Sequence, residues 1–276
     1  ETKSPPLGIY VKGTLPDVKT PVIAIVGTRK ATDSGIATAS HFAESLAAHG
    51  VSIASGLAFG IDAAAHRGAL AAHGHTIAVL AHGLHAYFPR TNTHLAEEIL
   101  SSGGAIISEY PPGTPSFPSQ FVVRNRIVSG LACGTIIVEA PQGSGALHTA
   151  YFAIEDNRDV FVIPGPVTHP NFVGSHELIR KYCAELVTRP RHVLESLGML
   201  GISETISNVQ RVITFEQPEM EKVFTLLQSR GEPLEIDKIS ELTNLNTQTV
   251  VQAITLLAIR GLLQETGEGF VINHHP

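Results

Sequence analysis

Short apolar runs alternate with helical patterns along the first two thirds of the chain. Each run is rich in valine, isoleucine or alanine and is apolar on both faces, as is typical of a strand inside a parallel sheet. The first helical stretch ends at Gly50, a residue that commonly closes a helix. The expected strands are 22–26, one that begins at 51, 76–81, 105–108, 135–139 and 160–163. One expected helix ends at 49, another begins at 62, and the others cover about 94–101, 119–131 and 145–156.

This alternation predicts an α/β fold of the Rossmann-like, doubly wound kind, with a mainly parallel sheet covered by helices on both faces. In such folds a ligand binds beyond the carboxyl ends of the strands. The loops that follow the strands are therefore the expected place for functional residues.

The pattern changes after Leu197. Residues 198–216 have weak periodicity and are predicted to be a linker. Three helical patterns and a short hairpin follow, which together are typical of a small winged-helix domain. The expected helices are about 219–229, 235–243 and 247–260, the expected hairpin strands are 262–264 and 270–272, and the expected domains are 1–197 and 217–276.

Charge is unevenly distributed over the 276 residues, whose net charge is −6. Residues 217–276 hold 4 basic residues against 8 acidic ones, and the third helical pattern carries only Arg260. A helix that reads duplex DNA needs a basic surface. We therefore favour a protein-contact or dimer-supporting role for this domain. Residues 1–200, with 14 basic and 15 acidic residues, still allow a local basic pocket.

The composition, with 43% hydrophobic and 16% charged residues, is that of a compact globular protein. Its apolar runs are too short to span a membrane. Cys133 and Cys183 lack the spacing of a metal site or a disulfide framework, so we expect a cytoplasmic protein. No secretory leader is visible after Glu1, and we expect the chain to be a trimmed fragment.

One candidate phosphate site lies in the stretch 51–66, V-S-I-A-S-G-L-A-F-G-I-D-A-A-A-H. It predicts a strand, a tight turn with Gly56 and Gly60, and a helix headed by Asp62. Glycines let a ligand approach the main chain, and a helix start attracts anions. An ordinary connecting loop is the alternative.

The loop after the first strand lacks the spacing of both G-x-G-x-x-G and the P-loop, since its glycines are Gly27 and Gly35. The usual anchors of dinucleotide binding and of nucleoside triphosphate hydrolysis are thus missing. The loop carries Arg29 and Lys30 instead, where a cation faces the expected cleft. A solvated surface charge is the alternative for each.

Further arginines stand beside aromatic residues. Arg90 follows a Tyr-Phe-Pro stretch, and R-N-R at 124–126 follows Phe121. Because the two arginines of R-N-R lie about 200° apart on an ideal helix, both cannot face one ligand unless the helix is just beginning there. Pairing of one of them with Glu109 or Glu139 is the alternative. Arginines next to rings are typical of a groove for single-stranded nucleic acid, whose backbone the charges hold and whose bases stack on the rings.

Two other kinds of site are not expected. The 14 histidines show no metal-ligand spacing and no H-E-x-x-H, so no metal site is predicted. Ser144 lies outside a G-x-S-x-G motif, because Gln142 stands two residues before it. We expect Ser144 and Gly145 to form a strand-to-helix anion loop.

Six motifs occur in order: I-V-G-T-R at 25–29, S-G-L-A-F-G-I-D-A-A-A-H at 55–66, T-I-A-V-L-A-H-G-L at 76–84, R-N-R-I-V-S-G-L at 124–131, G-S-G-A-L-H-T-A at 143–150 and V-I-P-G at 162–165. Together they resemble the DNA-processing protein A family, also called DprA or Smf, over about residues 7–190. The sequence departs from that pattern at Val123, where the family usually has proline, and at 176–179, His-Glu-Leu-Ile in place of Asn-Leu-Ile.

The resemblance implies a cytoplasmic bacterial protein of natural transformation and recombination. Such a protein binds and protects incoming single-stranded DNA, forms homodimers and helps load the RecA recombinase, without catalysis or a cofactor. The residues that match the family's DNA pocket are Arg29, Ser55, Gly56, Arg90, Arg124, Asn125 and Arg126, with Phe121 stacking nearby. Gly60, Ser144 and Gly145, from the glycine loops, complete the candidate DNA-binding set.

A phosphoribohydrolase of nucleoside monophosphates, of the LOG type, is the alternative with the same broad fold. Its loop reads P-G-G-x-G-T-x-x-E. The stretch 141–149 keeps the glycine spacing but has Thr149 where that family has its catalytic Glu. Without this carboxylate no obvious group assists glycosidic cleavage, and the sequence favours single-stranded DNA binding.

Overall fold

The structure is a computed structural model that describes residues 2–181, 183–199, 218–230, 233–259, 262–266 and 269–272. The chain divides into two compact units, 1–208 and 209–276. Most of the expected linker, 198–216, lies outside the described residues, so the domain boundaries stay a prediction.

The first unit is built on an eight-stranded sheet in the order β1-β5-β4-β3-β2-β6-β7-β8. All neighbouring strands are parallel except β1, which runs antiparallel to β5 at one edge. The strands are β1 Tyr10–Gly13, β2 Val22–Val26, β3 Ser52–Ser55, β4 Thr76–Leu80, β5 Ala105–Ser108, β6 Gly134–Ile137, β7 Asp159–Val162 and β8 Glu185–Leu186.

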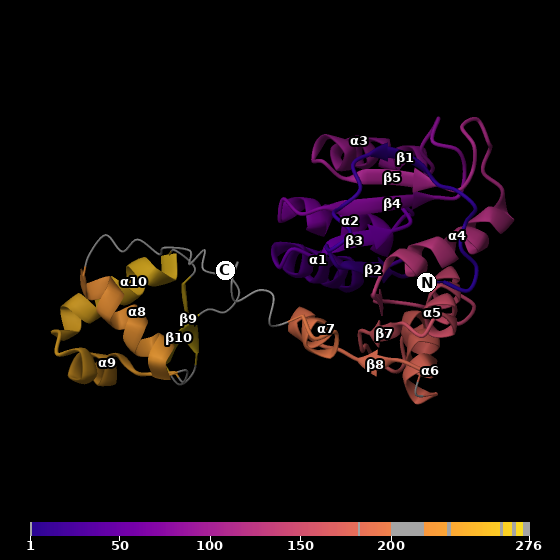
Figure 1. The fold of residues 1–276 in the computed structure, drawn as a ribbon. Coiled ribbons are helices and arrows are strands. Elements are labelled where there is room, and N and C mark those ends of the chain that lie inside the picture. Colours follow the sequence, from indigo (N-terminus) through magenta and orange to yellow (C-terminus); the bar gives the residue numbers. More distant parts are fainter. Residues whose placement is uncertain are drawn as a thin grey trace. The chain divides into compact units, whose positions relative to one another are not determined.

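Helices cover both faces of this sheet (Figure 1). The alternation within β2 shows why: Ile23 and Ile25 pack in a core with α1, α2 and α7, whereas Ala24 and Val26 pack on the opposite side with α4, α5 and α6. The helices are α1 Asp33–Ala48, α2 Ile61–Ala71, α3 Thr93–Ser101, α4 Pro118–Leu131, α5 Gly145–Glu155, α6 Val173–Arg180 and α7 Pro190–Ser196, with short 3₁₀ turns at Arg90–Asn92 and Pro170–Phe172.

The predicted doubly wound, mainly parallel sheet is therefore confirmed. Some details differ from the sequence pattern, and the helices α6 and α7 were not expected. The edge strand β8 was not expected, because its two residues are exposed and carry no apolar run. Asp62 was expected to head its helix, but α2 begins at Ile61, with Gly60 as N-cap at a φ of 72°. Glycine adopts this conformation without strain.

The second unit contains three helices and an antiparallel strand pair among its described residues. They are α8 Pro218–Arg230, α9 Ile236–Thr243, α10 Thr247–Ile259, β9 Leu263–Thr266 and β10 Gly269–Ile272. These elements share a core with Met220, Leu227, Val250 and Leu257 fully buried. Arg260 lies outside the described residues. The winged-helix assignment stays a prediction.

The direction of chain winding changes between β2 and β6. From β2 the chain builds the sheet outward through β3, β4 and β5, and it then returns to the other side of β2 with β6. The helices that follow β2 and β6 lie on opposite faces of the sheet. A crevice opens at the carboxyl ends of two such strands. Within the described residues, no helix has the length and apolar character needed to cross a membrane.

Candidate functional site

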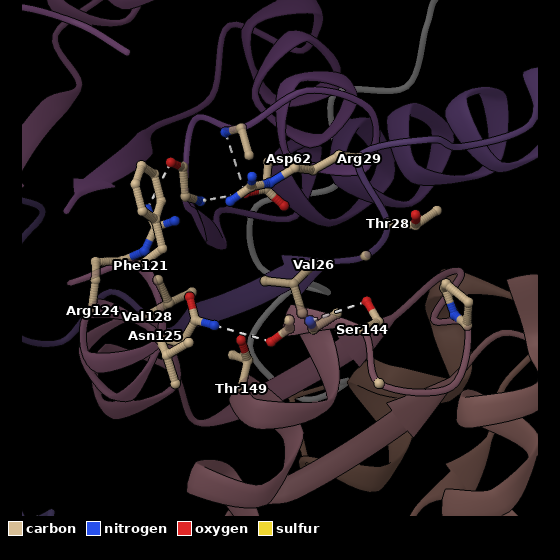
Figure 2. A pocket seen from close by; sticks show the side chains of 18 of the residues that line it. Val26, Thr28, Arg29, Asp62, Phe121, Arg124, Asn125, Val128, Ser144 and Thr149 are labelled. Atoms are coloured by element: carbon tan, nitrogen blue, oxygen red, sulfur yellow. Dashed lines mark hydrogen bonds between the residues drawn. The ribbon is translucent and has the colours of Figure 1, made fainter. Parts of the chain in front are cut away.

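A pocket of about 670 Å³ lies at this crevice. Its walls come from residues 26–30 at and after the end of β2, from Gly56 and Ala58 after β3, from α4, and from residues 141–146 and Thr149 before and within the start of α5. Asp62 of α2 and Phe88 after β4 also line it. Figure 2 shows labelled side chains from residues 26–29, from α2, from α4 and from the start of α5 around one space. The fold has thus brought together loops more than 100 residues apart in the sequence.

Exposed cations and aromatic rings lie together in the pocket wall. Arg29 and Lys30 line the pocket, and both side chains are exposed. The guanidinium carbon of Arg29 lies 5.2 Å from the centroid of the Phe121 ring, a cation–π contact. Phe88 packs edge-on against Phe121, with centroids 5.9 Å apart, and remains 48% exposed. Positive charge beside accessible aromatic rings is suited to a nucleotide chain, because the charge attracts phosphates and the rings stack with bases.

The start of α5 forms the opposite wall. Ser144 is its N-cap and accepts a hydrogen bond from the amide of Ala146 at 3.3 Å. The amide of Asn125, on α4, donates to the carbonyl of Gly145 at 3.0 Å and so ties the two helices together. A helix start leaves backbone N–H groups without partners inside the helix and carries a partial positive charge. This end of α5 is suited to an anion.

The glycine turn after β3 already holds an acceptor from the protein itself, the carboxyl group of Asp62. The amides of Gly56 and Ala58 donate to Asp62 Oδ2 at 3.2 and 3.3 Å. Burial raises the pKa of Asp62, and the charge of Arg124 together with these hydrogen bonds opposes that rise. The two amides that the sequence offered to a phosphate are therefore bonded inside the protein.

Arg124 is buried behind the same turn, with 4% of its surface exposed. Its Nη1 donates to the carbonyls of Gly56, at 2.7 Å, and Val79. Burial lowers the pKa of Arg124 to about 10, although the Asp62 charge opposes this, and the guanidinium stays charged at neutral pH. Its Nε has no hydrogen-bond partner among the described residues. Arg124 therefore anchors α4 to the ends of β3 and β4.

Arg126 points away from the pocket, as the expected separation of the two arginines requires. Its Nη2 lies 2.5 Å from Glu109 Oε1, and its Nη1 donates to the carbonyl of Ser4 at 2.8 Å. Pairing with Glu109 was one of the two expected alternatives. The other, Glu139, bonds instead to Thr32 and Asn171.

The pocket gathers most of the predicted site residues but not all of them. Those that line it are Arg29, Gly56, Phe121, Arg124, Asn125, Ser144 and Gly145. Ser55 is fully buried and donates to the carbonyl of Ile25 at 2.7 Å. Gly60 packs under the β2 loop, where a Cβ would meet the carbonyl of Thr28 at 2.5 Å. Arg90 is exposed and lies two residues beyond Phe88 of the pocket wall.

Several lining residues were missing from the predicted site, among them the polar or aromatic residues Thr28, Lys30, Phe88 and Thr149. Lys30 was noted as a cation facing the cleft, and Phe88 stands in the stretch before Arg90, so both had a sequence signal. Thr28 and Thr149 stand inside the motifs at 25–29 and 143–150, but a threonine side chain has no charge or ring that marks it as a DNA contact. Within the described part of the chain, no group of three or more histidines, cysteines or carboxylates is placed to hold a metal ion.

Comparison with known proteins gives concordant matches. The model of the family DNA recombination-mediator protein A matches residues 1–198. Protein Smf of Escherichia coli is 37% identical over 96% of this chain and 71% of its own length. DNA processing protein DprA of Streptococcus pneumoniae is 40% identical over 68% of this chain and 66% of its own.

The solved structures that are similar to the chain include two DNA processing proteins. One is DNA processing protein A from Streptococcus pneumoniae, with a TM-score of 0.64 and 40% identity, covering 68% of this chain and 65% of that one. The other, from Helicobacter pylori, was determined for its single-stranded DNA binding mode. It has a TM-score of 0.63 and 30% identity, and the match covers 71% of this chain and 88% of that one. The chain thus spans about two thirds of its longer relatives.

Proposed function

This chain belongs to the DNA recombination-mediator protein A family, and we propose that it binds single-stranded DNA in the pocket between β2 and β6. One observation carries this proposal: two exposed cations, Arg29 and Lys30, line the pocket beside the exposed ring of Phe88 and that of Phe121. The single-stranded DNA binding of the Helicobacter pylori relative supports it.

The charged and the aromatic parts of the pocket wall have different roles in the proposed binding. Arg29, Lys30 and the first turn of α5 face phosphate groups, because each offers positive charge or free N–H donors. Phe121 and Phe88 offer π-faces to bases, which stack without regard to sequence. Binding of this kind recognises an unpaired strand, because its bases have no pairing partner and are free to stack on the rings.

The finer parts of the proposal follow from the family. We infer that the chain acts in natural transformation and recombination in the cytoplasm, protects incoming single-stranded DNA, works as a homodimer and helps load the RecA recombinase. We assign the second unit, for which the sequence gives more acidic than basic residues, to a protein-contact or dimer-supporting role.

We propose that the protein acts by binding and not by catalysis. The alternative, a LOG-type phosphoribohydrolase, needs a carboxylate where this chain has Thr149. That threonine lines the pocket and is 2% exposed, so a neutral hydroxyl occupies the place of the acid. The Asp62 carboxylate, which also lines the pocket, is bonded to two backbone amides beside Arg124.

A salt series tests this function. Binding of an oligothymidylate to the whole chain is expected to weaken steeply as salt rises, with a slope of about −0.7 for each phosphate contacted. A duplex of equal length is expected to bind more weakly, because its bases are unavailable for stacking. Measurement by fluorescence anisotropy at several salt concentrations gives both results. Absence of oligonucleotide binding at low salt, with release of base from a nucleoside monophosphate, would instead support the enzyme.

Replacing Phe88 with alanine is expected to weaken oligothymidylate binding about fivefold. Loss of a stacked base costs about 1–3 kcal/mol, and a ring at the pocket edge belongs at the low end of that range. The salt slope stays unchanged, because no charge is removed. The matched control is Phe117→Ala: this ring is 54% exposed and does not line the pocket. Equal losses for both variants would count against a stacking role for Phe88.

A further inference from the structure

A buried carboxylate lies directly behind residues 27–32, the loop that follows β2. Glu139, two residues beyond β6, is fully buried, and it takes part in no ion pair among the described residues. A buried charge is costly unless hydrogen bonds replace its lost water. The hydrogen bonds of Glu139 therefore indicate which part of the structure its carboxylate stabilises.

Three donors surround the Glu139 carboxylate. The amide and the hydroxyl of Thr32 donate to Oε2 and Oε1 at 3.1 and 2.5 Å, and the side-chain amide of Asn171 donates to Oε2 at 2.8 Å. Thr32 is also the N-cap of α1, where its hydroxyl accepts from the amide of Gly35 at 3.0 Å. The carboxylate thus lies at the positive end of α1, which helps to stabilise its charge.

These contacts fix both ends of the segment that carries the two exposed cations. At one end the amide of Thr28 donates to the carbonyl of Glu139 at 2.7 Å. At the other end Thr32 bonds to the Glu139 carboxylate. Between them, Asn171 bridges the loop by donating to the carbonyl of Lys30 at 3.0 Å as well as to Glu139. Arg29 lies inside this frame.

The frame is closely packed. A Cβ on Gly27 would meet the carbonyl of Glu139 at 2.9 Å, and a Cβ on Gly35 would overlap the Glu139 carboxylate itself. Neither glycine leaves room for the loop to shift toward β6 or for the carboxylate to move toward α1. The backbone of residues 28–32 is therefore held on both sides of Arg29 and Lys30.

We propose that Glu139 is a positioning residue for DNA binding, which holds the backbone of residues 28–32 so that Arg29 and Lys30 face the pocket, with Asn171 as its partner. The proposal rests on the function proposed above. Under this proposal a negatively charged residue favours the binding of a polyanion, because it positions the two cations. The repulsion between its own charge and the DNA acts in the opposite direction.

The variant Glu139→Gln separates geometry from charge by the sign of its effect. Glutamine keeps the shape but offers a single acceptor oxygen, and its NH₂ group opposes the donors of Thr32 and Asn171. Removing a negative charge near the pocket by itself strengthens DNA binding. A positioning role gives the opposite result: we expect oligothymidylate affinity to fall about tenfold and the salt slope to lose about one phosphate contact.

Two further variants complete the test. Asn171→Ala removes the bridge without changing the charge, and we expect a loss in the same direction, about threefold. Glu109→Gln removes a carboxylate that pairs with Arg126 and does not bond to residues 28–32, so equal or tighter binding is expected. In parallel, deuterium exchange of the free protein is expected to be faster at residues 28–32 in Glu139→Gln, with the rest of the first unit unchanged.

The outcomes are distinct. Weaker binding by Glu139→Gln and Asn171→Ala, with faster exchange confined to residues 28–32, supports positioning. Wild-type binding combined with equal or tighter binding by Glu139→Gln overturns the positioning role and leaves the proposed function intact. Failure of the wild-type chain to bind the oligonucleotide overturns both.

Discussion

Replacing Arg29 with alanine is expected to weaken the binding of single-stranded DNA about 10- to 100-fold at low salt. Arg29 is exposed in the pocket wall and is held against the Phe121 ring. A hydrogen bond to a charged group contributes about 1.5–3 kcal/mol, and each 1.4 kcal/mol changes the dissociation constant about tenfold. The salt slope is expected to fall by about one phosphate contact, as measured by fluorescence anisotropy over a salt series.

A lysine at position 29 distinguishes charge from shape. Arg29→Lys keeps the positive charge but loses the planar group that stacks on Phe121 and bonds a phosphate through two N–H groups. We expect the salt slope of the wild type with only part of its affinity. Arg191→Ala is the control, because Arg191 is an exposed arginine paired with Glu195 and does not line the pocket. Equal affinities for Arg29→Ala and Arg191→Ala would contradict the assignment.

Replacing Asp62 with alanine is expected to destabilise the first unit by at least about 2 kcal/mol, because each buried backbone amide left without its acceptor costs about 1–3 kcal/mol. The variant leaves the guanidinium of Arg124 buried and the amides of Gly56 and Ala58 without their acceptor. Natural domains are stable by only about 5–15 kcal/mol. Urea unfolding of the whole chain, followed by circular dichroism, measures the change in the free energy of unfolding.

Removing both charges is expected to cost less than the sum of the two single changes. The double variant Asp62→Ala with Arg124→Met is compared with Asp62→Ala alone and Arg124→Met alone, because it leaves neither of the two ionisable groups buried without the other. A double-mutant cycle gives the coupling between the two residues. Asp33→Ala, at an exposed aspartate in the first turn of α1, is the control and is expected to change stability by less than about 1 kcal/mol. An equally small effect of Asp62→Ala would show that Arg124 does not depend on this carboxylate.

The positions of the central strands along the chain, and their mainly parallel sheet, could be predicted because burial imposes a strong pattern. Strands such as β2 and β4 are covered on both faces and must be apolar throughout. The edge strand β8 shows the limit of this signal. Its residues, Glu185 and Leu186, are exposed, and β8 pairs with the sheet along one side only. The pairing of β8 with β7 depends on where the preceding helix α6 ends, because the end of α6 brings the chain to the edge of the sheet.

The pocket could be predicted in outline, because residues that follow parallel strands meet at one edge of the sheet. The roles of individual charges could not. Arg29 and Arg124 look alike in the sequence, yet one is exposed beside an aromatic ring and the other is buried under backbone carbonyls. Asn171 lies 141 residues from Lys30, and no local pattern announces that its amide reaches the carbonyl of that residue.

The carboxylates of Asp62 and Glu139 also determine when the pocket becomes ordered. Each bonds to a backbone segment of the pocket wall, after β3 and β2 respectively, through contacts that lie entirely inside the protein. The conformational entropy of these two segments is therefore lost during folding and not at the moment of binding. An incoming strand meets walls that are already in place, and the entropy that remains to be lost on binding is largely its own.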